Sequence, residues 1–386
     1  MEQLSWSELA AYRARVRGCL LGGAIGDALG NPVELLSLDA IREKYGEAGV
    51  TGLVPDHEGV TGRVTDDTQM TLFTAEGWLR GYSRTTSRGL GGAEAMFIRD
   101  AYLRWLDTQN HPAPPPADNL RHRCGRLREE PWLYARRAPG NACLAGLLED
   151  HTPDPYGKPA GTPGPVNPGS KGCGTVMRSA PFGFTDHGAE RAFEFAAQCA
   201  QITHGHPTGY YAAGAFAAMI NHLVHGESPQ GAVLRAMELL ARYPGHEETT
   251  TVLRKAVDLA ADGVATAEKL QTLGAGWVAE EALAIGVYAL LGRTRIQTYY
   301  IGSQGTVCDP RPARTSIEAA FLLSVNHSGD SDSTGSICGN LLGAHHGDVR
   351  LPQHWLEWVE GRATIAVLAD DCASQVYPGE RRPWNH

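Results

Sequence analysis

Apolar residues along the chain recur every three or four positions, which is the spacing of one buried face of an α-helix. The clearest run comprises Leu20, Leu21, Ala24, Ile25, Ala28 and Leu29. Further helices are predicted just after Thr65 and over Gly209–Ile220, Trp277–Leu291 and Ile337–Ala344. Gly209–Ile220 is apolar on nearly every side, which indicates a central helix. The alternation typical of half-buried strands is scarce, so the pattern predicts an all-α fold.

Two of these helices carry glycine at every fourth position. The two rows are Gly22, Gly26, Gly30 and Gly335, Gly339, Gly343. Each row leaves a smooth stripe that another helix can approach closely, although each glycine costs up to about 1 kcal/mol of helix propensity. Close packing alone explains such stripes, and this packing would draw distant segments of the chain together.

Three loop-rich stretches interrupt the helical pattern: Gln109–Asp118, His151–Ser170 and Arg293–Arg314. The first two are rich in proline, which removes a backbone donor, so regular helix is not expected in them. No linker clearly separates two hydrophobic cores, and no internal repeat is evident. We therefore expect one compact multi-helix domain over residues 1–386, with its motifs between about residues 16 and 346.

Charge and cysteine content narrow the classes of function. A formal net charge of −9 argues against a protein that binds nucleic-acid backbones by bulk electrostatics. It does not argue against a small anionic ligand held by metal ions and backbone amides. The eight cysteines are scattered without a CxxC pair, which favours reduced thiols and a cytoplasmic location. No apolar run approaches the roughly 18 residues of a membrane span, so none is expected.

The first candidate for chemistry is the acidic cluster Thr65-Asp66-Asp67-Thr68, where a helix is predicted to begin. Threonine and aspartate at that place can simply cap the helix, because they accept hydrogen bonds from its free amides. Two adjacent carboxylates are more than capping requires. They point in different directions, so each could serve a different cation.

A second acidic cluster, Asp330-Ser331-Asp332-Ser333-Thr334, precedes the second glycine-striped helix. Its Asp-x-Asp spacing turns both carboxylates towards one point, beside the hydroxyl of Ser333. Oxygen ligands of this kind suit Mg²⁺, Mn²⁺ or Ca²⁺ rather than zinc. Helix capping is again the alternative.

Together the two clusters place four carboxylates at two helix entrances, and neither cluster contains a basic residue. Two divalent cations would resolve the repulsion between these acids, as in binuclear sites that clamp oxygens of substrate and water. Glu34 follows Gly30-Asn31-Pro32, just past a helix end, so its side chain can enter a cleft. An ordinary solvated glutamate is the alternative there.

Five ordered motifs resemble those of the ADP-ribosylglycohydrolase family, including its dinitrogenase-reductase-activating group. They are Arg17–Gly30 with Glu34 following, Thr65–Thr68, Lys171–Arg178, Thr203-His204 and Gly329–Ser333. The resemblance implies an all-helical domain with a binuclear cleft that holds two Mg²⁺ ions, or Mn²⁺, and binds ADP-ribose.

By the same resemblance, the catalytic residues are Glu34, Asp67 and Asp330. The implied metal ligands are Thr65, Asp66, Asp67, Asp330, Asp332 and Ser333. The implied substrate-binding residues are Ser170, Lys171, Gly172, Cys173, Gly174 and His204. Many relatives have asparagine at the position of Cys173, and some have an aromatic residue at that of Lys171.

The resemblance thus implies a Mg²⁺-dependent hydrolase that cleaves the glycosidic bond between ADP-ribose and a modified protein or small molecule, releasing ADP-ribose. The motifs around Cys173 and His204 favour an N-linked arginine conjugate, with an O-linked serine conjugate or another conjugate as the alternative. A binuclear phosphoesterase and a non-catalytic, crystallin-like relative that binds ADP-ribose or is structural are further alternatives. Loss of the metal acids would favour the last, but all four are present.

Overall fold

The computed structural model of the protein describes residues 5–88, 91–154, 156–292 and 316–378. The stretch Arg293–Arg314 therefore lies outside the described residues. Within these ranges the regular structure is helical, with no strands, as the hydrophobic pattern predicts. The α-helices are α1 Trp6–Gly30, α2 Leu38–Tyr45, α3 Asp66–Arg88, α4 Glu94–Asn110, α5 Asn141–Leu147, α6 Ala189–Ala200, α7 Pro207–Val224, α8 Pro229–Leu240, α9 Glu247–Ala261, α10 Ala267–Gln271, α11 Ala279–Leu291, α12 Ser316–Val325, α13 Ser331–His346, α14 Gln353–Leu356 and α15 Arg362–Val376. Short 3₁₀ helices are η1 Asn31–Val33, η2 Leu127–Glu129, η3 Pro131–Leu133, η4 Cys173–Thr175, η5 Ala180–Gly183 and η6 Asp348–Arg350.

Several helices begin at side chains that satisfy their free amides. Ser5 caps α1: its hydroxyl accepts from the amide of Glu8, and the Glu8 carboxylate accepts from the amide of Ser5 at 2.8 Å. Ser228 caps α8 in the same way through the amide of Gly231, ahead of Pro229 at the first helical position. These local signals fix where the elements begin, while burial decides how they pack.

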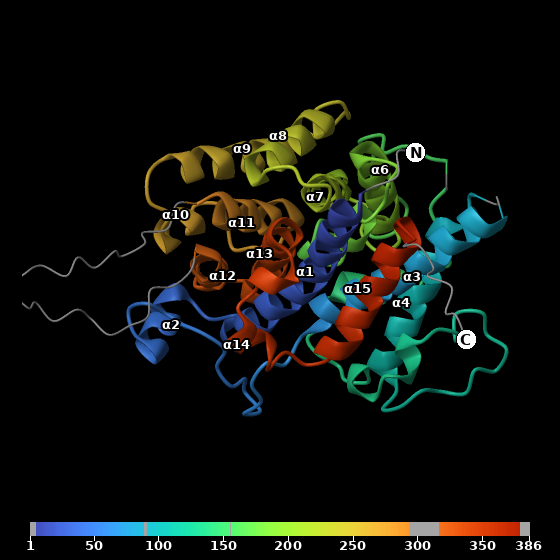
Figure 1. The fold of residues 1–386 in the computed structure, drawn as a ribbon, viewed down its shortest axis with the longest axis horizontal. Coiled ribbons are helices and arrows are strands. Elements are labelled where there is room, and N and C mark those ends of the chain that lie inside the picture. Colours follow the sequence, from blue (N-terminus) through green and yellow to red (C-terminus); the bar gives the residue numbers. More distant parts are fainter. Residues whose placement is uncertain (1–4, 89–90, 155, 293–315, 379–386) are drawn as a thin grey trace, which may run out of the picture.

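The two glycine-striped helices, α1 and α13, pack against each other in antiparallel directions through their glycines (Figure 1). Gly22 lies against Gly339, and Gly26 against Gly335. A Cβ atom at Gly26 would overlap the backbone of Gly335 and lie 2.9 Å from the amide nitrogen of Ser336. The contact therefore needs glycine, and it brings the end of α1 beside the start of α13.

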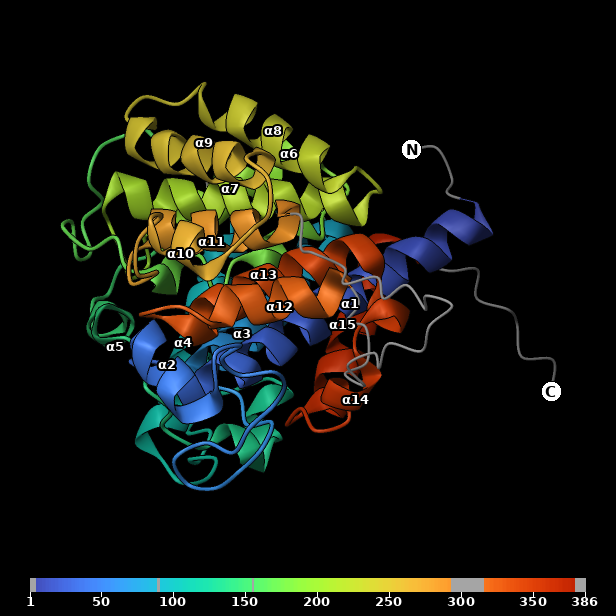
Figure 2. The same ribbon diagram turned by 90° about the vertical axis from the view of Figure 1, so that its left-hand side faces the viewer.

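The remaining helices cover this central pair from two sides. Figure 2 shows α8 and α9 stacked on α7 and α11, which lie next to α13, while α3 lies on the opposite side of α1. α15 packs on α1 and α3, and α4 packs on α3. Buried apolar side chains from Tyr12 to Val376 form one hydrophobic core. The extent of the domain over residues 1–386 remains a prediction.

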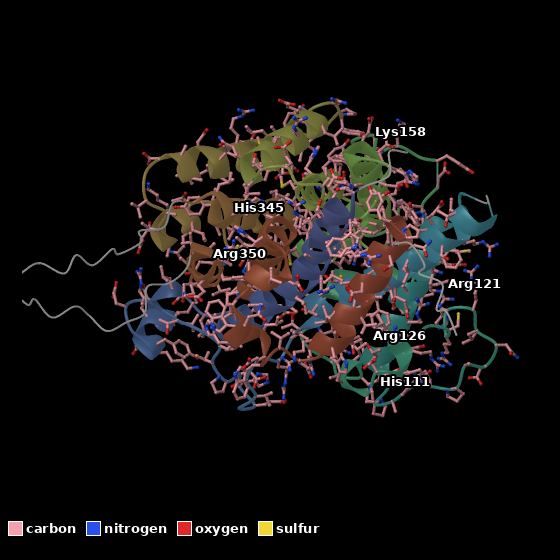
Figure 3. The ribbon with its side chains drawn as sticks, viewed as in Figure 1. His111, Arg121, Arg126, Lys158, His345 and Arg350 are labelled. Atoms are coloured by element: carbon pink, nitrogen blue, oxygen red, sulfur yellow. The ribbon has the colours of Figure 1, made fainter. Side chains whose placement is uncertain are left out.

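Several boundaries differ from the sequence prediction, and α7 and α13 extend beyond the ranges Gly209–Ile220 and Ile337–Ala344 at both ends. The helix expected over Trp277–Leu291 begins at Ala279, because the backbone of Trp277 and Val278 pairs instead with a loop around Gly172 in an isolated antiparallel bridge. α4 continues to Asn110, two residues into the first loop-rich stretch. Charged side chains such as those of Arg121, Arg126 and Lys158 lie at the periphery (Figure 3). In the described ranges, none of the helices combines the length and the apolar character that crossing a membrane requires.

Candidate active site

The end of α1 and the starts of α3 and α13 meet at one pocket of about 230 Å³. Nearly all the residues predicted for the site line it. They are Glu34, Asp66, Asp67, Ser170, Gly172, Cys173, Gly174, His204, Asp330, Asp332 and Ser333. Segments that are up to about 300 residues apart in the sequence are thereby brought together, as the glycine stripes suggest.

Two predicted site residues do not line the pocket. Thr65 lies at the first turn of α3, where its hydroxyl accepts from the amide of Asp67 at 3.3 Å. The ammonium of Lys171 pairs with the carboxylates of Glu248, at 2.6 Å, and Glu280. The resemblance assigns Lys171 to the substrate, whereas in this structure its charge is held by these two acids.

Six neighbouring carboxyl groups, five of them lining the pocket, are called the acid cluster: Glu34, Asp66, Asp67, Asp330 and Asp332 line it, and Asp27 lies close enough to act on their charge. All are buried except Glu34, which is half-buried. In the described part of the chain, no lysine, arginine or histidine forms an ion pair with any of them.

The acid cluster is electrostatically frustrated, as the pKa values show. Burial, followed by the carboxylates of Asp332 and Asp27, raises the pKa of Glu34 to about 8. Burial and Asp332 raise the pKa of Asp27 to about 7, although hydrogen bonds from Thr68 and Thr65 lower it. For Asp66, Asp67 and Asp330 the same two causes, burial first and then Asp332, raise the pKa well above its ordinary value. Burial also raises the pKa of Asp332.

The donor chemistry of the acid cluster suits a hard cation. Oδ1 of Asp67 is buried and makes no hydrogen bond within the described residues, an arrangement that is costly unless a positive partner is supplied. Carboxylate and hydroxyl oxygens are the ligands that Mg²⁺ and Mn²⁺ prefer. Across the described ranges, however, no three His, Cys, Asp or Glu side chains converge as the ligands of a bound ion do. The cluster thus has the donors of a hard-cation site without the geometry of a formed one.

Both acidic motifs also cap their helices, which is the alternative function of these residues. Asp330 is the N-cap of α13, and its Oδ1 accepts from the amide of Ser333 at 3.4 Å. Its other oxygen, Oδ2, accepts from the thiol of Cys173 at 2.8 Å. Capping uses only part of the available oxygens, so it does not exclude a second role.

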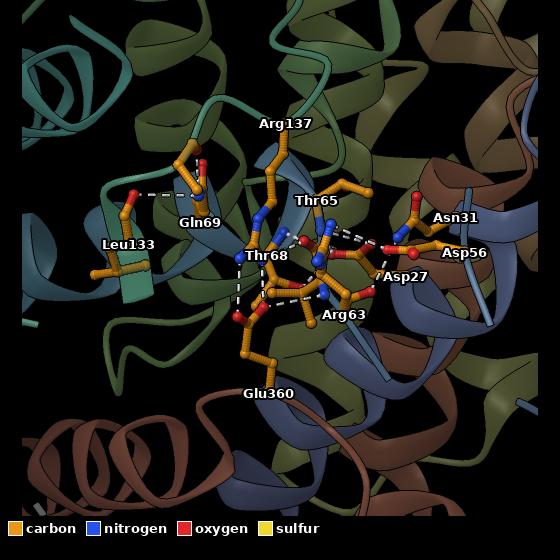
Figure 4. Close-up of polar contacts among 12 residues, drawn as sticks. Asp27, Asn31, Asp56, Arg63, Thr65, Thr68, Gln69, Leu133, Arg137 and Glu360 are labelled. Carbon is orange, nitrogen blue, oxygen red and sulfur yellow. Dashed lines mark hydrogen bonds and ion pairs between the residues drawn. The ribbon is translucent and has the colours of Figure 1, made fainter. Parts of the chain in front are cut away.

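Sequence reasoning assigned no role to Asp27, which organises the start of α3. Its carboxylate accepts from the amide of Thr65 at 3.0 Å and from the amide and hydroxyl of Thr68 at 3.1 and 2.5 Å (Figure 4). Asp27 lies one turn before the end of α1, so these bonds tie α1 to α3. The signal in the sequence is an aspartate within the otherwise apolar stretch Gly18–Gly30, a position that normally needs a partner.

The loop before η4 presents backbone amides to the pocket. The amide of Cys173 donates to the carbonyl of Trp277 at 3.1 Å, and that of Ala279 donates to the carbonyl of Lys171 at 2.8 Å. The amides of Gly172 and Gly174 make no hydrogen bond within the described residues. These two donors at the pocket wall suit an anionic ligand.

Trp277, which sequence reasoning treated as the start of a helix, lies at the pocket with 42% of its surface exposed. Its backbone is fixed by the pairing with the Cys173 loop. An exposed aromatic side chain on a fixed backbone offers a flat apolar surface to a ligand. The available signal in the sequence was an aromatic residue directly after Gly276. In the structure the φ of Gly276 is +84°, which indicates a turn.

His204 also lines the pocket, next to Gly172 and Gly174. It is buried, and burial together with the nearby Arg178 guanidinium lowers the pKa of His204 to about 3. The imidazole is therefore neutral at ordinary pH. It can donate or accept a hydrogen bond in the pocket without adding charge.

Known proteins with related sequences indicate the family of this chain. The family model described as ADP-ribosylglycohydrolase matches residues 8–382. ADP-ribosyl-[dinitrogen reductase] glycohydrolase of Rhodospirillum rubrum is 24% identical over 350 residues, covering 89% of this chain and 89% of that protein. ADP-ribosylarginine hydrolase Tri1 of Pseudomonas putida is 23% identical over 361 residues, covering 92% of this chain and 77% of that protein.

A solved structure, an ADP-ribosylglycohydrolase-related protein complex, shares the fold with a TM-score of 0.60 at 23% identity. The alignment covers 95% of this chain and 99% of the solved one. Because the family model spans almost the whole sequence and the motifs that carry the resemblance meet at one pocket, the chain belongs to the ADP-ribosylglycohydrolase family.

Proposed function

We propose that the protein is a divalent-metal-dependent ADP-ribosylhydrolase that cleaves the glycosidic bond between ADP-ribose and a modified arginine side chain. One observation carries the proposal: five buried or half-buried carboxyl groups, without a neutralising basic residue in the described chain, line one pocket together with two loop glycines whose amides are unpaired. Such a pocket suits a ligand that is bound both through cations held by the acids and through its own negative charge at the amides.

In this proposal the metal ligands are Thr65, Asp66, Asp67, Asp330, Asp332 and Ser333, holding two Mg²⁺ or Mn²⁺ ions. When bound, the ions neutralise these acids and orient the ribose hydroxyls and the attacking water. Thr65 does not line the pocket, and its hydroxyl accepts from the amide of Asp67. It would therefore support the site through its contact with Asp67. Asp67 and Asp330 count as catalytic because they would hold the ions that orient the ribose hydroxyls and the attacking water.

Glu34 acts on the attacking water, which it orients or deprotonates. It is the one carboxylate lining the described pocket that lies outside both acidic motifs. Its half-buried position leaves it accessible to a ligand, and a base works best when its pKa lies near the operating pH. The transition state at the ribose carbon has oxocarbenium character, so neighbouring carboxylates also stabilise it.

The loop before η4, with His204, binds the rest of ADP-ribose. The amides of Gly172 and Gly174 and the imidazole of His204 donate to the diphosphate, while Ser170 and Cys173 shape the loop. Trp277 stacks on the adenine base. Lys171 contributes indirectly, because its ion pairs with Glu248 and Glu280 hold the loop in place.

Leaving-group chemistry supports the arginine linkage. An arginine conjugate is already a guanidinium cation, so its C–N bond breaks to release neutral guanidine, which then takes up the proton lost by the attacking water. It therefore needs little acid assistance, whereas a serine alkoxide needs a well-placed proton donor. Among the carboxylates that line the described pocket, Glu34 alone lies outside the metal motifs, and it is already engaged with the water in this scheme. The name of the Pseudomonas putida relative points to the same linkage in that protein.

Matched peptides carrying ADP-ribosyl-arginine or ADP-ribosyl-serine test the proposal directly. We expect Mg²⁺-dependent release of intact ADP-ribose, faster from the arginine peptide, with Asp67→Ala as the inactive control. Faster release from serine would overturn the linkage. Release of phosphate or AMP would indicate a phosphoesterase, and tight ADP-ribose binding without turnover of any conjugate would indicate a non-catalytic relative.

A further inference from the structure

Arg178 lies wholly inside the protein, and no carboxylate within the described chain is in ion-pair distance of it. Its guanidinium lies 4.5 Å from the centre of the Tyr102 ring. One nitrogen, Nη2, donates to the hydroxyl of Thr203 at 2.6 Å, and the other, Nη1, contacts the sulfur atoms of Cys143 at 3.4 Å and Met70 at 3.8 Å. Burying a charge without a counter-ion is costly, so its retention behind the pocket calls for a function.

The hydrogen bonds beyond Arg178 have a defined direction. A guanidinium can only donate, so the Thr203 hydroxyl accepts from Arg178 and must direct its own hydrogen elsewhere. Oγ1 of Thr203 lies 2.7 Å from Nδ1 of His204. Among the described residues that hydroxyl has no other hydrogen-bond acceptor, so it donates to Nδ1. A neutral imidazole that accepts at Nδ1 carries its proton on Nε2.

The Nε2 atom of His204 faces the glycines of the pocket loop. A Cβ atom at Gly172 would lie 3.2 Å from Nε2, and one at Gly174 would lie 3.5 Å from it. Nε2 itself makes no hydrogen bond to another described residue. Its N–H bond therefore points towards the same wall of the pocket as the unpaired amides of Gly172 and Gly174.

We propose that Arg178, acting through Thr203, is a positioning residue that fixes His204 as a neutral Nε2–H donor for an anionic oxygen of the ligand's diphosphate. The identity of that ligand rests on the proposed function. The chain of hydrogen bonds itself does not, because it is formed within the protein. Without it, the isolated imidazole would populate both tautomers, and the Nδ1–H form would turn a lone pair towards the phosphate and weaken binding.

Nitrogen-15 NMR of the unaltered protein tests the chain without any substitution. With labelled histidine, the signals of His204 are assigned among the 15 histidines by their loss in His204→Gln. We expect the Nε2–H tautomer at pH 7, both without ligand and with ADP-ribose bound. An Nδ1–H tautomer, an even mixture or an imidazolium would overturn the proposal.

Paired substitutions separate positioning from packing. Thr203→Val removes the hydroxyl, and Thr203→Ser keeps it. We expect the valine variant to show mixed tautomers and to bind ADP-ribose roughly 10-fold more weakly, the scale of one hydrogen bond to a charged group, with serine restoring both. Affinity for adenosine, which lacks the diphosphate, should not change. Unchanged tautomer and ADP-ribose affinity in the valine variant would refute the chain.

Arg178 is tested in the same way with Arg178→Met, which removes the donor, and Arg178→Gln, which retains an N–H donor. The methionine variant should populate the Nδ1–H form, and the glutamine variant should keep the Nε2–H form. If the variants do not fold, the spectrum of the unaltered protein still decides. If ADP-ribose fails to bind the unaltered protein, the proposed function fails, while the tautomer measured without ligand still judges the chain.

Discussion

Gly26→Ala adds one methyl group where α1 and α13 touch. The new Cβ would overlap the backbone of Gly335, which has no side chain that could move aside. The two helices must therefore separate locally. Overpacking typically costs about 1–3 kcal/mol, and a backbone contact belongs at the upper end. Since replacing glycine by alanine returns up to about 1 kcal/mol of helix propensity, we expect a net loss of about 2 kcal/mol.

This loss has a measurable size. Unfolding entropy is about 2.1 cal/mol/K per residue, so 386 residues give about 0.8 kcal/mol/K and a fall in Tm of roughly 2–3 °C. Activity should fall much further, because Asp27 follows directly and anchors the start of α3. A shift of about 1 Å in such an arrangement can cost about 10²-fold in rate.

Scanning calorimetry and hydrolysis rates on Gly26→Ala, Gly18→Ala and Gly231→Ala make the test specific. Gly18 sits in the same helix contact, where a Cβ would lie 2.7 Å from the carbonyl carbon of Gly347, but about 12 Å further from the pocket. It should lose similar stability and keep more activity. A Cβ atom at Gly231 in α8 would meet only side-chain atoms, the carboxylate of Glu227 and the hydroxyl of Ser228, which can move aside, so Gly231→Ala should keep its activity and lose little stability. If Gly26→Ala melts at the wild-type temperature with wild-type activity, the helices are not in the close contact described.

The other predictions concern the acid cluster and the pocket walls. Because burial raises the pKa of Glu34 to about 8 from its ordinary 4.5, the metal-free protein should lose stability as pH rises between these values, and Mg²⁺ should flatten that slope in thermal melts. Asp67→Asn removes one repelling charge, so it should raise Tm in the absence of metal. In the wild type, Mg²⁺ at 100 times its Kd should add about 2.7 kcal/mol of stability, and the variant should lose this stabilisation. An undiminished stabilisation by Mg²⁺ would exclude Asp67 as a ligand. Glu34→Gln should keep ADP-ribose affinity but slow turnover by roughly 10²-fold, and a near-normal rate would show that no such base is needed. Trp277→Ala should weaken ADP-ribose binding roughly 10-fold by titration calorimetry, while Trp358→Ala, an exposed tryptophan outside the pocket, should not; equal affinities would remove Trp277 from the site.

Local patterns in the sequence predict much of the fold. The helical period, the glycine rows and the acidic motifs at the starts of α3 and α13 are all signals that act within a few residues. The glycine rows predicted a close approach of another helix at each stripe, but not that the two rows pack against each other. The placement of Glu34 just beyond the end of α1 was also predicted, and the structure puts it at the pocket.

Features that depend on contacts between distant segments were not predictable in this way. The ion pairs of Lys171, the four hydrogen bonds to Asp27 and the bridge that places Trp277 at the pocket each join residues 38 or more positions apart. No spacing in the sequence encodes them. The start of α11 was misplaced for the same reason, since pairing with the Gly172 loop outweighs the helical preference of Trp277 and Val278.

The pairing of α1 with α13 also limits how early the protein can fold during its synthesis on the ribosome. Gly26 and Gly335 are separated by 309 residues, 335 minus 26, so their contact closes a very long loop. At a synthesis rate of about 5–20 residues per second, α1 waits roughly 15–60 s before α13 has been made. During that time the glycine face of α1 has no partner helix. Asp27 and Glu34 at its end are likewise present before the acids of α13 with which they form the acid cluster. Contacts of such high order slow folding, so the pocket is expected to be among the last parts of the protein to form.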